Sequence, residues 1–140
     1  MKYLLICILT SFILNSCISD KLNDYEITAD LIDPEIPPVM DFNLTTFEFD
    51  TVAIGSEVEY EFIFTNKGPG PLLINSVKAG CGCTVLKNWP KHPIQPGENG
   101  SIPVVLTTKR AGFTKKYISV LANTEPGVNK LFLQGYVVGL

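Results

Sequence analysis

Apolar and polar residues alternate along much of the chain after residue 45. The clearest case is residues 56–65, SEVEYEFIFT, in which Val58, Tyr60, Phe62 and Phe64 fall on one side and three glutamates fall on the other. A period of two is the pattern of a β-strand with one face buried and one face in water. This segment therefore predicts a half-buried antiparallel strand.

Six further segments show strand character, and sequences rich in glycine and proline separate them. Turns are predicted at NKGPGP, PIQPGENG and TEPG, because glycine supplies positive φ and proline blocks strand continuation. About seven short strands with a turn every 8–12 residues predict an all-β, two-sheet antiparallel sandwich. A barrel closed by the same strands is the alternative. The six segments are residues 45–52, 72–78, 84–86, 102–108, 115–123 and 130–138.

The sandwich must be held together by its apolar faces. In antibody domains a tryptophan lies between two bridged cysteines, but here Trp89 follows both Cys81 and Cys83. The candidate core residues are Phe49, Tyr60, Phe62, Phe64, Leu73, Ile74, Val104, Leu106, Tyr117, Ile118, Val120, Leu131, Leu133 and Tyr136.

The first residues predict an export signal. The apolar run from Tyr3 to Leu14 is shorter than the roughly 20 residues that a spanning helix needs. It ends in Leu14-Asn15-Ser16-Cys17, which resembles the lipobox of bacterial lipoproteins, although Asn15 departs from the usual small residue. We expect a signal peptide at 1–16, lipidation of Cys17 and a membrane-anchored protein of the cell envelope, in the outer membrane or facing the periplasm. The alternative is an ordinary secretory signal followed by an incidental cysteine.

Composition divides the remainder into a tether at 17–42 and a sandwich domain at 43–140. The tether is acidic and contains three prolines, which is typical of an extended linker, although residues 25–31 could instead form a helix or pack on the domain. Residues 18–61 hold twelve acidic and one basic residue, whereas residues 62–140 hold nine basic and two acidic residues. No basic run exceeds two residues, so nucleic-acid binding is not expected.

The series from FEFDTVAIGSEVEYEFIFTNKGPGPLLINSVKAGCGCTV through PIQPGENGSIPVVLTT to KKYISVLANTEP resembles the domain-of-unknown-function family 1573. The resemblance covers about residues 46–138, with a minor departure in that the family's usual glycine is absent after Phe49. It implies a small bacterial domain, often lipid-anchored, with an immunoglobulin-like sandwich of the sperm-protein and ciliary type. It implies nothing definite about activity.

The Cys81-Gly82-Cys83 sequence has four interpretations. An export signal favours a disulfide, and Gly82 can shorten the distance between the two cysteines. The thiols could instead pack as small apolar groups, exchange with other thiols, or bind Cu(I) or Zn(II) together with His92. The chain holds one histidine and no recognisable catalytic motif, so an enzyme is not expected.

We therefore expect a non-catalytic binding or scaffolding module with no cofactor and no small-molecule substrate. An envelope protein would dock on an exposed strand edge or on the loops at 80–88 and 93–100. A thiol- or metal-handling protein is the alternative. Trp89 is expected to plug the core under a loop and not to form a contact site, and Thr51 lies in an Asp-Thr-Val sequence that resembles an O-glycosylation site.

Overall fold

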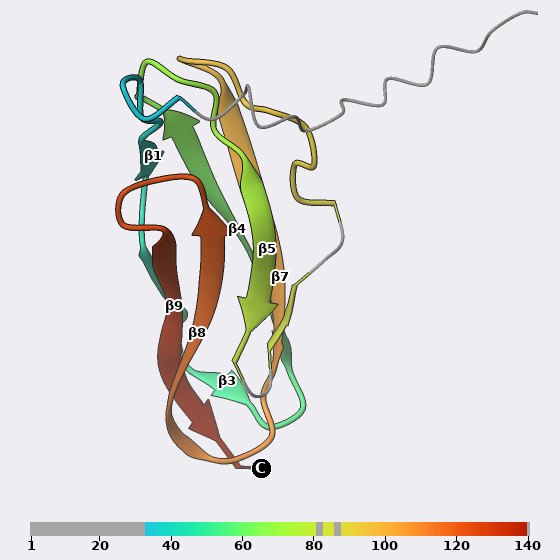
Figure 1. Cartoon of the computed structure of the whole chain (residues 1–140). Helices are drawn as coiled ribbons and strands as arrows, with labels where there is room; N and C mark the ends of the chain where they lie inside the picture. Colours follow the sequence, from blue (N-terminus) through green and yellow to red (C-terminus); the bar gives the residue numbers. More distant parts are fainter. Residues whose placement is uncertain (1–32, 81–82, 86–87, 140) are drawn as a thin grey trace, which may run out of the picture.

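The computed structural model describes residues 33–80, 83–85 and 88–139, with the backbone alone described for 83–85. These residues form nine β-strands and no helix, which confirms the predicted all-β class (Figure 1). In this part of the chain no helix has the length and apolar character needed to cross a membrane. The strands are β1 (Met40–Phe42), β2 (Thr46–Glu48), β3 (Val52–Ala53), β4 (Glu57–Asn66), β5 (Ile74–Ala79), β6 (Cys83–Val85), β7 (Asn99–Thr107), β8 (Gly112–Ala122) and β9 (Val128–Val138).

The strands build two packed sheets, as the sandwich prediction required. The four-stranded sheet has the order β1-β4-β7-β6, and the five-stranded sheet has the order β2-β9-β8-β5 with β3 also on β9. Most pairs are antiparallel, but β2 and β3 run parallel to β9. The segment predicted as the first strand thus forms two short strands, β2 and β3. Both pair with β9, the last strand of the chain.

The core lies between the sheets and follows the predicted alternation. Along β4 the inward residues Val58, Phe62 and Phe64 are buried, whereas the glutamates between them are exposed. Two candidate core residues were wrong: Tyr117 is 49% exposed and Tyr136 is 60% exposed. Both are out of phase with the buried positions of their strands, so they lie on the outer face of the five-stranded sheet.

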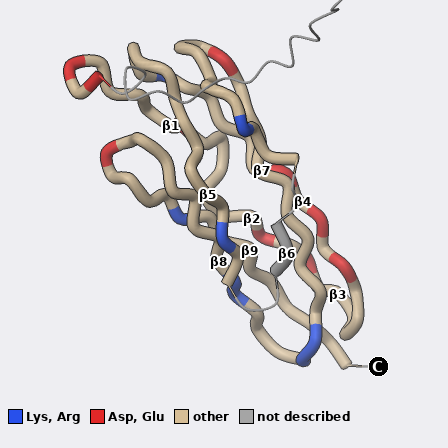
Figure 2. The backbone as a smooth tube through the Cα atoms, turned by 45° about the vertical axis from the view of Figure 1, so that its right-hand side comes forward, with Lys and Arg blue, Asp and Glu red and all other residues tan. Residues whose placement is uncertain are grey.

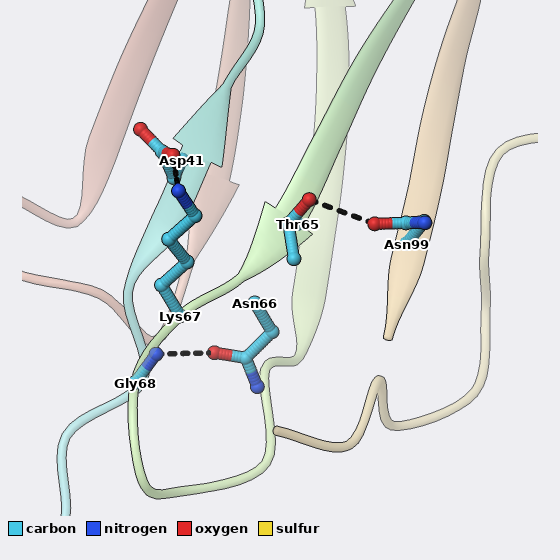
Figure 3. Close-up of polar contacts among 6 residues, drawn as sticks. All are labelled: Asp41, Thr65, Asn66, Lys67, Gly68 and Asn99. Carbon is cyan, nitrogen blue, oxygen red and sulfur yellow. Dashed lines mark hydrogen bonds and ion pairs between the residues drawn. The ribbon is translucent and has the colours of Figure 1, made fainter. Parts of the chain in front are cut away.

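Asn66 is the polar centre of the end where the described chain begins (Figure 3). Its side chain is fully buried. Its Oδ1 accepts hydrogen bonds from the Gly68 amide at 3.0 Å and the Val39 amide at 3.3 Å. Its Nδ2 donates to the carbonyls of Gly70 at 2.8 Å and Ile94 at 2.9 Å. One side chain therefore ties the β4–β5 loop to two distant segments.

Residues 36–42, which we call the strap, lie across that loop. A Cβ on Gly68 or Gly70 would overlap strap backbone, so glycine permits the close approach there. The Lys67 ammonium also lies 2.9 Å from the Asp41 carboxylate (Figure 3). Within the described residues, strand pairing begins at Met40, upstream of the boundary expected at residue 43.

Candidate functional site

The outer face of the five-stranded sheet carries two aromatic pairs that link β8 to β9. Phe113 is opposite Tyr136, and Tyr117 is opposite Phe132. The Phe113 and Tyr136 rings are 5.4 Å apart between centroids in an edge-on arrangement, and these side chains are 58% and 60% exposed. Because the inward positions hold aliphatic residues such as Ile118, the alternation places all four rings on the outer face, where Phe132 is half-buried and the other three are exposed.

Two lysines lie over this aromatic surface. The Lys115 Nζ is 4.8 Å from the centroid of the Phe132 ring, and the Lys130 Nζ is 5.9 Å from that of Tyr117. Both distances are within the range of a cation–π attraction. We call this surface the aromatic–lysine face, and it consists of Phe113, Lys115, Tyr117, Lys130, Phe132 and Tyr136.

The aromatic–lysine face is suited to docking. Exposed rings lose water favourably when a partner covers them, and ammonium groups select a partner of negative charge. At the β2 edge of this sheet, Gln134 Nε2 donates to the Glu48 carboxylate at 2.7 Å, which provides a polar border. Among the described residues, no three His, Cys, Asp or Glu side chains are grouped to hold a metal ion.

A hollow of about 600 Å³ lies beside this face, at the end of the sandwich near the C terminus. Its wall includes the turn between β7 and β8 and the start of β8. We call it the basic pocket, and it is lined by Leu106, Thr107, Lys109, Arg110, Ala111, Phe113, Thr114, Lys115 and Lys116. Phe113 and Lys115 belong to both the pocket and the face.

The charge asymmetry of the sequence becomes an asymmetry between surfaces. Acidic segments lie along β4, whereas basic segments lie on β8 and around the end near the C terminus (Figure 2). On β4 the outward positions include Glu57, Glu59 and Glu61, all exposed. The two sheets thus present outer faces of opposite sign.

The cysteine-based predictions lie mostly outside the described residues. Cys17 and Cys81 are not among them, and of Cys83 only the backbone is described, paired with Leu106 at the edge of the four-stranded sheet. His92 is exposed in the loop before Ile94. The disulfide, free-thiol, thiol-exchange and metal interpretations therefore stay predictions. Thiol counting with and without reductant, and metal analysis after copper and zinc supplementation, would separate them.

Trp89 packs against the core cluster with a half-buried side chain, as the plug interpretation expected. The Lys91 Nζ lies 2.6 Å from the centroid of the indole ring. Loss of hydration at this position lowers the pKa of Lys91. Thr51 is exposed between β2 and β3, and its glycosylation stays a prediction.

Sequence reasoning missed the aromatic–lysine face because it assigned Tyr117 and Tyr136 to the core. The signal was present in the phase of the alternation. In KYISVL, the aliphatic residues Ile118 and Val120 share one face of the strand and Tyr117 falls on the other. In LFLQGYV, Leu131 and Leu133 share one face and Tyr136 falls on the other. The strand register was also needed, because it sets the aromatic residues of β8 and β9 side by side.

Fold and site together define an immunoglobulin-like β-sandwich domain with a solvent-exposed aromatic and basic surface. The chain belongs to the family described as Protein of unknown function (DUF1573), whose model matches residues 40–137. The match begins at the first residue of β1. No curated protein sequence matches the chain at a significant level.

Solved structures share the fold at low sequence identity. A protein of unknown function from Porphyromonas gingivalis W83 has a TM-score of 0.61 and 15% identity, over 78% of this chain and 51% of that one. The ASH/PapD-like domain 7 of human CEP192 has a TM-score of 0.58 and 10% identity, over 81% and 94%. The secreted serine protease VesC from Vibrio cholerae has a TM-score of 0.58 and 11% identity, over 75% and 24%. The chain thus spans about half of the first protein and about a quarter of the protease.

Proposed function

We propose that the protein is a non-catalytic binding module of the cell envelope, held at a membrane by lipidation of Cys17. Its aromatic–lysine face docks the acidic surface of an envelope protein. The single observation that carries the proposal is this face, where three exposed rings and the half-buried Phe132 lie on paired strands and two lysines lie over rings of the face. Aromatic side chains are the usual anchors of protein interfaces.

The charge of the face supports an acidic partner. Lysine is rarer in ordinary protein interfaces than on the rest of the surface, because its charge must be matched by the partner. The ammonium groups over these rings therefore favour a partner that supplies carboxylates. The glutamates of β4 lie on the other sheet, so they do not neutralise the lysines of this face. The docked complex should therefore weaken as the salt concentration rises.

The position of the strap supports a membrane anchor at the end of the domain opposite the β7–β8 turn. The described chain enters the fold at the upper end in Figure 1, far from the β7–β8 turn. A tether of about 20 residues has a root-mean-square span of roughly 25 Å. Lipidated Cys17 would thus hold the strap end toward the membrane and leave the aromatic–lysine face accessible along the side of the domain.

Site-specific photo-crosslinking in native membranes tests the docking proposal. A photoreactive phenylalanine analogue at Tyr136 should give a discrete crosslinked product that high salt reduces. The matched control is Ile63, which is 44% exposed on the outer face of the four-stranded sheet. Equal products at both positions, or a crosslink from Tyr136 to the chain's own residues 18–32, would overturn the proposal.

Mass spectrometry of the mature protein tests the anchor. We expect a chain that starts at residue 17 and carries a diacylglycerol and an amide-linked acyl group, recovered with the membranes. Cys17→Ser should lose the lipid mass. An unmodified residue 17 in the wild-type protein would refute lipidation and leave the docking proposal intact, because crosslinking measures that separately.

A further inference from the structure

The basic pocket concentrates positive charge. Lys109, Arg110, Lys115 and Lys116 line it, and no aspartate or glutamate is among its described lining residues, although Glu57 is the cross-strand partner of the lining residue Thr107. Within the described residues, the one ion pair is that of Lys67 with Asp41 at the other end of the fold. The neighbouring charges of Lys109 and Arg110 repel each other, so a bound anion would lower the energy of the folded protein.

The lining has the chemistry of an oxyanion site. Arg110 offers a planar fork of N–H donors that matches phosphate, and lysines add further donors. Thr107 and Thr114, which carry hydroxyl groups, also belong to the lining. Phe113 provides an apolar wall against which the organic part of a ligand can pack. At about 600 Å³ the hollow falls in the size range of small-molecule sites and exceeds the needs of a lone anion.

The location distinguishes this pocket from the membrane end of the molecule. β8 has 11 residues, and it separates the β7–β8 turn from the opposite end by about 35 Å. The strap joins the sandwich at that opposite end (Figure 1). The pocket therefore lies at the end of the domain opposite the place where the described chain enters the fold.

We propose that the basic pocket binds a phosphate monoester, with Lys109 and Arg110 of the β7–β8 turn holding the phosphate and Phe113 packing on the group that carries it. A dianionic ligand balances several cations at once, which a single carboxylate does not. The proposal does not depend on the docking function of the aromatic–lysine face. A soluble phosphorylated compound and a phosphate-bearing lipid of a second membrane offer the same chemistry.

The test uses the intact protein in nanodiscs of phosphatidylcholine. Glycerol 3-phosphate should shift the backbone amide resonances of residues 106–116 and should raise the unfolding temperature. Lys109→Ala/Arg110→Ala should weaken binding at least about tenfold, because hydrogen bonds to charged groups are among the strong ones. The control Lys67→Ala/Lys78→Ala removes the same charge outside the pocket and should change affinity less than about threefold.

A second arm identifies the source of the phosphate. Vesicles containing phosphatidic acid, compared with phosphatidylcholine vesicles, are mixed with the loaded nanodiscs and sedimented. Co-sedimentation that Lys109→Ala/Arg110→Ala abolishes would assign the pocket to a lipid phosphate. Binding of glycerol 3-phosphate without co-sedimentation would assign it to a soluble ester. Equal weakening by both double variants, or no response in either arm, would overturn the proposal.

Discussion

Replacing Asn66 by alanine should be among the most destabilising single changes in the fold. The side chain is fully buried, and both ends of its amide are used twice. Four hydrogen bonds at a net value of about 1 kcal/mol each set the scale at roughly 4 kcal/mol. The Ile94 carbonyl keeps a second donor, the Leu72 amide at 2.9 Å, so its loss counts less. We therefore expect a loss of about 3 kcal/mol.

That loss should lower the unfolding temperature by about 15 °C in a domain of this size. Urea unfolding followed by circular dichroism and by the fluorescence of Trp89, the one tryptophan, would measure it. The slope of free energy against urea should stay unchanged, because the surface exposed on unfolding is the same. The matched control is Asn99→Ala, which removes only an exposed hydrogen bond of 2.7 Å with Thr65 and should cost less than about 1 kcal/mol.

Asn66→Asp separates hydrogen bonding from packing. The substitution keeps the size and the two accepted bonds, but it removes both donated bonds and buries a negative charge near two carbonyls. At neutral pH it should destabilise at least as much as Asn66→Ala. If either variant at this position loses no more stability than Asn99→Ala, the assigned role of Asn66 is wrong.

Three further changes test separate parts of the fold by the same urea assay. Gly135→Ala places a methyl group into the backbone and ring of Phe49 and should cost about 3 kcal/mol, whereas Gly139→Ala meets nothing closer than 3.9 Å and should stay within about 0.5 kcal/mol. Thr108→Val removes a buried hydroxyl whose single proton is shared between two backbone carbonyls at 2.9 and 3.1 Å, and it should cost about 1–2 kcal/mol. The pKa of Lys91 is lowered from 10.5, so between its lowered value and 10.5 the unfolded chain holds more protons and stability rises with pH. In Lys91→Gln that part of the rise should vanish, and an unchanged pH profile would contradict the shift.

The strand content could be predicted because alternation is a local property. The predicted strand at 56–65 corresponds to β4, and the segment at 130–138 falls within β9. The division of this segment into β2 and β3 could not be predicted from local alternation. These strands are defined by their parallel pairing with β9, some 85 residues further along the chain. No pattern within residues 45–52 contains that information.

The role of Asn66 was hidden for the same kind of reason. Within NKGPGP it is typical of a turn residue, and a turn residue is normally exposed. It is buried because the strap returns over the loop and because Ile94 pairs with Leu72 beside it. A buried polar residue of this kind can be recognised only once the segments that satisfy its hydrogen bonds have been placed.

The distribution of charge links the fold to both proposals. Acidic residues fall early in the chain and basic residues late, and the topology assigns β4 to one sheet and β8 and β9 to the other. A sequence gradient thereby becomes two outer faces of opposite sign (Figure 2). An anionic partner that approaches the domain is repelled by the glutamates of β4 and attracted to the aromatic–lysine face and the basic pocket, over distances of about 10 Å at moderate salt. Because Phe113 and Lys115 belong to both surfaces, an acidic protein on the face and a phosphate in the pocket should influence each other's binding.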